Sequence, residues 1–486
     1  MKRFVVAVAF VVPAACTVPA AAPPPPVLGV TPTLPALLAH VRAANPRVRA
    51  QTDRVAAAGY SAAAVDGFFD TTVSAASGFA EGAMRAPGSI LPGVAPAEAW
   101  VTGVAADRPL RQGVWLRGSL TRWDSLGGGA ADNDSGTVAG AALEKPLLRD
   151  RGFALQRLER EAARQGVEVA QASRQTVWQD TCHAVTLAYV DWLDAHAEQV
   201  ESLAASGRVA RLLAETEARV ALDATPSYQL ASARMEVAFR QDDLHRAQAA
   251  LDAARIRLVE LAGGDLPLDA LPPPEADELR RWADACARAG RDAPFALRVP
   301  ERPEWRAAAA AAAQADTLAR HAREDLKSDL SLFGGVGWRL NNEPGRRGDS
   351  DLAWEAGVVW RSPPGHDTAK ARAAAREADA CAARADLAAT ITAATAEFER
   401  ARAAFESACS RLAPISRAVE EARASLEAEA ERFRLGEGRS RLVLDAQKDL
   451  SAANRSANAA AAQTIRAYAD QARAAGVPFA PFHPTP

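Results

Sequence analysis

Residues 432–446 read RFRLGEGRSRLVLDA and separate two long segments that are rich in Ala, Arg and Glu. The glycines Gly436 and Gly438 supply the positive φ angle that a tight reversal of the chain needs. Ser440 follows as the expected N-cap of a returning helix, and apolar residues resume at Leu442. The stretch therefore predicts the tip of a long helical hairpin.

A weaker copy of this tip stands at residues 219–233, which read RVALDATPSYQLASA. Each copy has an Arg followed by an apolar residue, then a turn, and then a Ser that leads into an apolar helix. In the weaker copy Asp223-Ala-Thr225 forms the turn, and Thr225 is the expected N-cap. We therefore expect a second hairpin, whose helices run from 149 to about 222 and from 227 to 261.

A second repeated marker lies upstream of each tip. Asn45-Pro46-Arg-Val-Arg49 and Arg302-Pro303-Glu-Trp-Arg306 each open an Ala-rich helix, so the chain is internally duplicated. The first copy holds more chain between its two markers than the second. In the second copy the hairpin helices are expected from about 367 to 435 and from 440 to 475, and a connector with a short helix at 275–289 joins the copies.

Between the markers of the second copy, residues 330–340 and 352–361 alternate with a period of two, which indicates β-strands. One apolar face of these strands carries Trp338, Trp354 and Trp360. A strand with an apolar, Trp-bearing outer face suits a membrane β-barrel. A soluble sheet with one packed face is the alternative interpretation.

The first copy has the same kind of alternation at 69–79 and an extra predicted hairpin. Its strands are 100–107 and 114–123, and Pro109–Gly113 supplies the turn between them. This hairpin accounts for most of the additional chain in the first copy. It either joins the same sheet or forms an excursion outside it.

Composition excludes several classes of protein. The 57 Lys and Arg nearly balance the 60 Asp and Glu, and a net charge of −3 gives no general attraction to nucleic acid. No apolar run approaches the about 20 residues of a spanning helix, so a helical inner-membrane transporter is excluded. A membrane β-barrel is not excluded, because its strands are short and alternate. No GxxxxGK[ST] phosphate loop is present, so the chain has no evident energy source of its own.

The N-terminus has the features of a secretory signal. Lys2 and Arg3 precede an apolar run, Phe4–Ala15, followed by small residues. The run ends in Pro13-Ala-Ala-Cys16, which resembles a bacterial lipobox with Pro13 in the place of the usual Leu, Val or Ile, so we expect Cys16 to be lipidated. Cleavage within the Ala/Pro stretch 18–26 is the alternative. Residues 17–35 are Pro-rich and are expected to form an extended tether.

The residue types that carry chemistry are scattered. Four further cysteines have no spacing of a disulfide framework and are expected to be small buried hydrophobes: Cys182, Cys286, Cys381 and Cys409. The histidines form no i,i+4 pair, so no metal site is predicted. Ser173, Asp180 and His183 spread along one helix without the arrangement of a catalytic triad. We therefore expect neither an enzyme nor a cofactor.

The order of elements, namely signal, tether, helix, strands, helical hairpin and connector, and then the same series again, resembles the TolC-like family of outer-membrane efflux proteins. Residues 14–18 resemble the lipoprotein start of that family. Residues 143–152, LEKPLLRDRG, resemble the passage from a last strand into a long helix. Residues 432–446 resemble the family's tip motif, and in the weaker copy Asp223 replaces the usual glycine and Gln229 the usual acidic residue.

The resemblance implies a mainly α fold with a membrane β-barrel. Duplicated coiled-coil hairpins would form a periplasmic tunnel, and each chain of a homotrimer would add strands to one shared barrel in outer-membrane lipid. It also implies a periplasmic adaptor and an inner-membrane pump of RND, ABC or MFS type, with no nucleic acid among the partners. The residues expected to meet the adaptor are those of the hairpin tips: Asp223, Thr225, Ser227, Gly436, Gly438, Arg439, Ser440, Leu442 and Asp445.

The expected organisation follows from these patterns. It comprises a signal peptide (1–16), the tether (17–35), a first repeat (36–263, with strands in 69–146 and a hairpin in 149–263), the connector (264–302), a second repeat (303–476, with strands in 329–361 and a hairpin in 367–475) and a tail (477–486). The expected function is a passive efflux duct for drugs or small solutes across the periplasm and outer membrane. A type I protein secretion duct and a non-conducting periplasmic coiled-coil scaffold are the alternatives.

Overall fold

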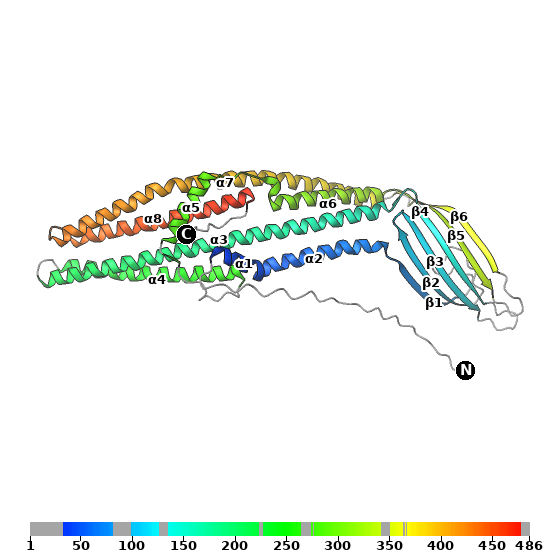
Figure 1. Cartoon of the computed structure of the whole chain (residues 1–486), viewed down its shortest axis with the longest axis horizontal. Coiled ribbons are helices and arrows are strands. Elements are labelled where there is room, and N and C mark those ends of the chain that lie inside the picture. The colour runs from blue at the N-terminus through cyan, green and yellow to red at the C-terminus, as the bar shows by residue number, and fades with distance from the viewer. Residues whose placement is uncertain are drawn as a thin grey trace, which may run out of the picture.

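The computed structural model describes residues 33–80, 99–125, 135–222, 227–263, 274–275, 277–341, 350–362, 365 and 367–477. The molecule is elongated, with one β-sheet at one end and the tips of two helical hairpins at the other (Figure 1). The signal segment, most of the tether, Cys16, Asp223, Thr225 and nearly all of the C-terminal tail lie outside the described residues.

The α-helices of the described part follow the predicted order: α1 (Leu34–Ala44), α2 (Pro46–Asp66), α3 (Ala154–Ala221), α4 (Tyr228–Ala262), α5 (Glu278–Asp292), α6 (Pro303–Asp325), α7 (Asp367–Arg434) and α8 (Ser440–Ala475). Helices α3 and α7 have 68 residues each, which corresponds to about 100 Å. The prediction of two long helical hairpins is confirmed.

Three helix boundaries differ from the prediction. Helix α3 begins at Ala154 and not at 149, because Asp150 and Phe153 adopt positive φ angles, which L-residues do not sustain in a helix. Helix α5 spans Glu278–Asp292, shifted from 275–289. It ends before Ala293, whose φ of −139° fits the residue that precedes a proline.

The third difference is α1, which begins at Leu34, inside the range predicted as tether. Its apolar side chains Leu34, Leu37 and Val41 are fully buried at the spacing of one helix face. They join a mid-body core together with Val185 of α3 and Ile465 of α8. The first residues of the described chain therefore anchor the helical body.

The strands form one antiparallel sheet in the order β1 to β6. They are β1 (Thr72–Ala80), β2 (Ala99–Leu110), β3 (Val114–Ser125), β4 (Ser135–Pro146), β5 (Asp329–Asn341) and β6 (Ser350–Arg361). The extra hairpin β2–β3 of the first repeat is part of this sheet. Strands β4 and β5, one from each repeat, pair directly.

The position of Pro109 corrects the predicted turn between β2 and β3. Pro109 belongs to β2 and pairs with Trp115, near the strand end where proline is tolerated. The turn itself is closed by Gly113, whose amide donates to the carbonyl of Leu110 at 2.9 Å. Gly113 takes a φ of +79°, which a glycine adopts freely.

Strand register gathers the apolar side chains on one face of the sheet. One row across all six strands comprises Ala75, Val104, Leu120, Ala139, Trp338 and Leu352. Trp354 and Trp360 of β6 lie on the same face with exposed fractions of 78% and 67%. The opposite face carries the ion pairs of Arg117 with Asp107 and Glu144. The predicted alternation of apolar and polar faces is confirmed.

Candidate functional site: the hairpin tips

The tip between α7 and α8 is closed by backbone hydrogen bonds. The amide of Gly436 donates to the carbonyl of Phe433 at 3.0 Å, and the amides of Glu437 and Gly438 donate to the carbonyl of Arg432 at 3.0 and 3.1 Å. Gly436 has a φ of +85°. A Cβ atom on Gly438 would lie 2.9 Å from the backbone nitrogen of Phe433. The expected positive φ angle is thus confirmed for Gly436 but not for Gly438, where the close approach of the backbone is what excludes a side chain.

Ser440 does not cap α8, which corrects the sequence interpretation. The N-cap position is occupied by Arg439, without a side-chain capping bond, and Ser440 is the first helical residue. The buried hydroxyl of Ser440 instead donates to Oε1 of Gln229 at 2.7 Å. Because Gln229 belongs to α4, this bond joins the two hairpin tips to each other.

A small apolar core lies behind the tips. Val209 and Leu212 of α3 pack there with Phe433, Val443 and Leu444 of the other hairpin. The guanidinium of Arg219 lies 4.2 Å from the centroid of the Phe433 ring. The two tips thus form a single packed unit at the end of the molecule.

The remaining predicted tip residues are exposed. The N-cap position of α4 is occupied by Ser227 and not by Thr225, which corrects the sequence interpretation, and the Ser227 side chain makes no capping bond. Leu442 is 49% exposed, and Arg439 is exposed beside it. Asp445 approaches Arg441 at 4.0 Å across one helical turn, so it lies on a solvated face. Exposed apolar side chains gather at the same end, from both hairpins: Leu222, Tyr228, Leu435 and Leu442.

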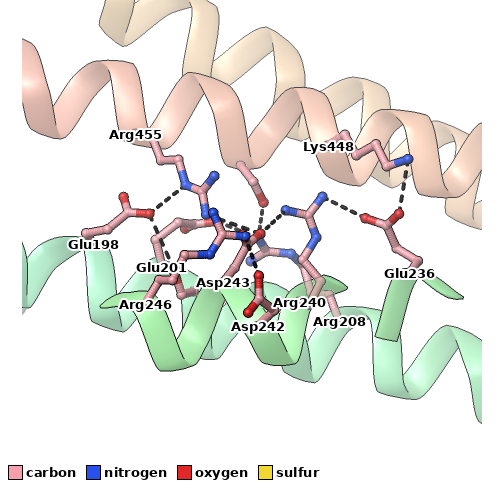
Figure 2. Close-up of polar contacts among 12 residues, drawn as sticks. Glu198, Glu201, Arg208, Glu236, Arg240, Asp242, Asp243, Arg246, Lys448 and Arg455 are labelled. Atoms are coloured by element: carbon pink, nitrogen blue, oxygen red, sulfur yellow. Dashed lines mark hydrogen bonds and ion pairs between the residues drawn. The ribbon is translucent and has the colours of Figure 1, made fainter. Parts of the chain in front are cut away.

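An ion cluster ties α8 to the α3–α4 hairpin (Figure 2). At one end of the cluster, Glu236 of α4 is 3% exposed and binds Arg240 at 2.7 Å and Lys448 of α8 at 3.1 Å. Arg455 of α8 binds Glu198 of α3 at 2.7 Å. We call the whole set the inter-hairpin cluster: Glu198, Glu201, Arg208, Glu236, Arg240, Asp243, Lys448 and Arg455.

Burial shapes the electrostatics of this cluster. Loss of solvent raises the pKa of the Glu198 carboxyl above its usual value, and Arg455 opposes that rise. Polar partners satisfy part of the cluster: Arg208 donates to Ser451 at 3.0 Å and Asn454 donates to Glu201 at 3.0 Å. Breaking a buried pair leaves an uncompensated charge, so the cluster resists separation of the two hairpins.

Sequence reasoning missed this cluster. Its signal was present, because Glu236, Arg240 and Asp243 stand at the i,i+4 and i,i+3 spacings of one helix face. Pairs of Arg and Glu at these spacings usually lie on a solvated helix face. Glu236 does not, because it is buried against Lys448 of α8, and the side chain of Arg240 beside it is only 11% exposed.

Three other sequence expectations concern reactive groups. Among the described residues, Asp180 pairs with Arg473 and His183 with Asp470, so the structure does not join them into one unit. No group of three His, Cys, Asp or Glu in the described ranges is placed to hold a metal ion. Cys286 is buried as expected, but Cys381 is exposed, which corrects the prediction that every cysteine is a buried hydrophobe.

The described chain has no helix long and apolar enough to cross a membrane. No protein-family model matches the sequence, and no curated protein matches it. Several solved structures do match over most of their length. The outer-membrane channel OprN has 21% identity and a TM-score of 0.64, over 92% of this chain and 90% of that chain.

Two further structures give the same result. The outer membrane protein VceC of Vibrio cholerae has 15% identity and a TM-score of 0.65, covering 92% of this chain and 97% of its own. The open state of the Neisseria gonorrhoeae MtrE outer membrane channel has 18% identity and a TM-score of 0.65, with coverages of 92% and 89%. The chain has the fold of these outer-membrane proteins, and the fold expected from the TolC-like resemblance is confirmed.

Proposed function

We propose that this chain is the outer-membrane duct of a tripartite efflux system, a passive conduit for drugs or small solutes. The observation that carries the proposal is that the two faces of the sheet differ, one being apolar and the other charged. One face exposes an apolar row from every strand, with Trp354 and Trp360 at its β6 edge, and the other face bears charges. This is the arrangement of a wall between lipid and water.

The edges of the sheet support a multimeric barrel. In one chain, β1 pairs only with β2 and β6 only with β5 among the described strands. Unpaired backbone groups at such edges are costly in lipid. Copies of the chain that pair β1 with a neighbouring β6 would satisfy them, and we propose a homotrimer that does so in the outer membrane, anchored in addition by a lipid on Cys16.

The length of the hairpins and the exposed apolar residues at their tips favour a periplasmic tunnel that ends at an adaptor protein. Helices α3 and α7 run from near the sheet to the tips (Figure 1), and their about 100 Å length suits the periplasm. The exposed Leu222, Tyr228, Leu435 and Leu442 would dock a periplasmic adaptor. An inner-membrane pump of RND, ABC or MFS type would supply the energy.

Membrane fractionation combined with single-channel conductance tests this proposal. We expect a trimer in the outer-membrane fraction that conducts ions in planar bilayers, and a Cys16→Ser variant that conducts but lacks the lipid mass. A soluble, non-conducting species would refute the duct and leave the coiled-coil scaffold. Substrate export in cells that carry a candidate pump would then separate solute efflux from protein secretion.

A further inference from the structure

A groove is lined by residues of α1, α2 and α3 and of the first part of α6. Its volume is about 880 Å³. Small side chains form part of the lining, among them Ala172 of α3 and Ala309 and Ala313 of α6. Because alanine leaves the space above the backbone open, the groove has room for a bulky ligand.

Two aromatic side chains line the groove. Trp178 of α3 and Trp305 of α6 are both partly buried, and Trp178 also packs against the mid-body core. The guanidinium of Arg42 lies 5.7 Å from the centroid of the Trp178 ring. Indole faces stack well on planar apolar groups, which favours a ligand with an aromatic or flat hydrocarbon body.

Three arginines also line the groove: Arg42, Arg174 and Arg306. In the described part of the chain no ion pair includes any of them, and the guanidinium of Arg306 donates to the carbonyl of Pro300 at 3.3 Å. Nearby arginines of α6 are paired, as Arg320 is with Glu161 at 2.7 Å. The groove therefore holds an excess of uncompensated positive charge, against one lining acid, Glu168.

We propose that this groove binds an amphiphilic organic anion, with a flat apolar body and a carboxylate or sulfonate head. The indoles of Trp178 and Trp305 receive the body. The planar guanidinium groups of Arg174 and Arg306 bind the head in the forked geometry that suits carboxylates. The proposal goes beyond the duct function and stands independently of it, since binding to the purified protein requires no transport.

Isothermal titration calorimetry of the full-length protein in detergent tests the proposal, with 2-naphthoate as the anionic probe and 2-naphthamide as its neutral counterpart. We expect saturable binding of 2-naphthoate at one site per chain and weaker binding of 2-naphthamide. Arg174→Gln and Arg306→Gln should each weaken 2-naphthoate by about tenfold, the loss of one hydrogen bond to a charged group. Trp305→Leu should weaken both probes.

The matched control is Arg164→Gln, because Arg164 is exposed on the same helix α3 but does not line the groove. It should bind 2-naphthoate as the unmodified protein does. Circular dichroism and oligomer size confirm that each variant is folded. If Arg174→Gln fails to fold, Trp305→Leu still tests whether the groove is the binding site. Absence of 2-naphthoate binding, equal affinity for the two probes, or an equal loss in Arg164→Gln would overturn the proposal. Conductance of the same preparation reports on the duct separately.

Discussion

Arg219 lies over the ring of Phe433, with 4.2 Å between the guanidinium carbon and the ring centroid, and it donates to the carbonyl of Arg434 at 3.1 Å. Arg219 belongs to the tip of the first repeat and Phe433 to the tip of the second. The repeated motif therefore does more than reverse the chain twice, because a side chain of the first tip packs on and hydrogen-bonds to the second tip.

Replacing Arg219 should loosen the packing of the two tips. In Arg219→Ala we expect a loss of about 1 kcal/mol from the cation–π contact, seen as hydrogen exchange of the α7–α8 tip amides that is faster by about fivefold. Arg439→Ala is the control, since Arg439 is exposed at the same tip. Equal exchange rates in the two variants would contradict a role for the Arg219–Phe433 contact.

Glu236 should be the most sensitive carboxylate of the inter-hairpin cluster. Its side chain is 4% exposed and contacts Arg240 and Lys448. Glu236→Ala removes a buried partner of Arg240, which keeps Asp243, and should cost about 1–3 kcal/mol. The exposed pair of Asp242 with Arg246 offers a control, for which Asp242→Ala should cost about 0–1 kcal/mol. Thermal unfolding and protection of α8 amides would show the difference, and similar effects would refute a burial-dependent role.

The glycines of the second tip should not tolerate alanine. Gly436→Ala places a side chain at a φ of +85°, which costs about 1–2 kcal/mol. Gly438→Ala drives a Cβ against the backbone of Phe433. Gly207→Ala in α3 is the control, because a Cβ atom there would have open space within 4 Å, and it should stabilise by about 0.5–1 kcal/mol. Limited proteolysis should cut only the first two variants faster at the tip.

The apolar sheet face predicts a position-dependent effect on membrane insertion. Trp354→Arg puts a charge on the exposed apolar face, where it costs about 2–4 kcal/mol at the centre of a bilayer. Ala353→Arg places the same charge on the opposite face of β6, because neighbouring residues of a strand alternate. We expect only Trp354→Arg to reduce the heat-modifiable species in the outer-membrane fraction. An equal loss in the two variants would contradict the assignment, because the effect would then not depend on which face of β6 carries the charge.

Thiol labelling should separate two of the cysteines. Burial raises the pKa of the Cys286 thiol to about 12, so its reactive thiolate is scarce at pH 8. As long as the pH is below this pKa, the thiolate fraction rises about tenfold for each unit by which the pH is raised. Cys381 is exposed and should react first with iodoacetamide, as mass spectrometry would show. Loss of the early label in Cys381→Ser is the control, and prompt labelling of Cys286 at pH 8 would contradict its burial.

Short local sequence patterns predict most of the helices, strands and turns of this fold. The turn residues Gly436 and Gly438 and the two-residue alternation around Trp354 act within a few residues of chain, so they were predictable. Helix α1 was also within reach, since Leu34, Leu37 and Val41 have helical spacing, but the adjoining prolines favoured a tether. Asp223, Thr225 and Cys16 remain predictions, because they lie outside the described residues.

The sequence by itself determined the hairpins, the strands and their duplication, because glycine conformation and hydrophobic period are properties of neighbouring residues. Only the tertiary structure decided which charges are buried and which partner the hydroxyl of Ser440 takes. Ser440 reaches Gln229, and Glu236 meets Lys448, across separations in the chain that no local rule spans. Such contacts depend on how the helices pack, and packing follows from the complementarity of whole faces and not from any one residue.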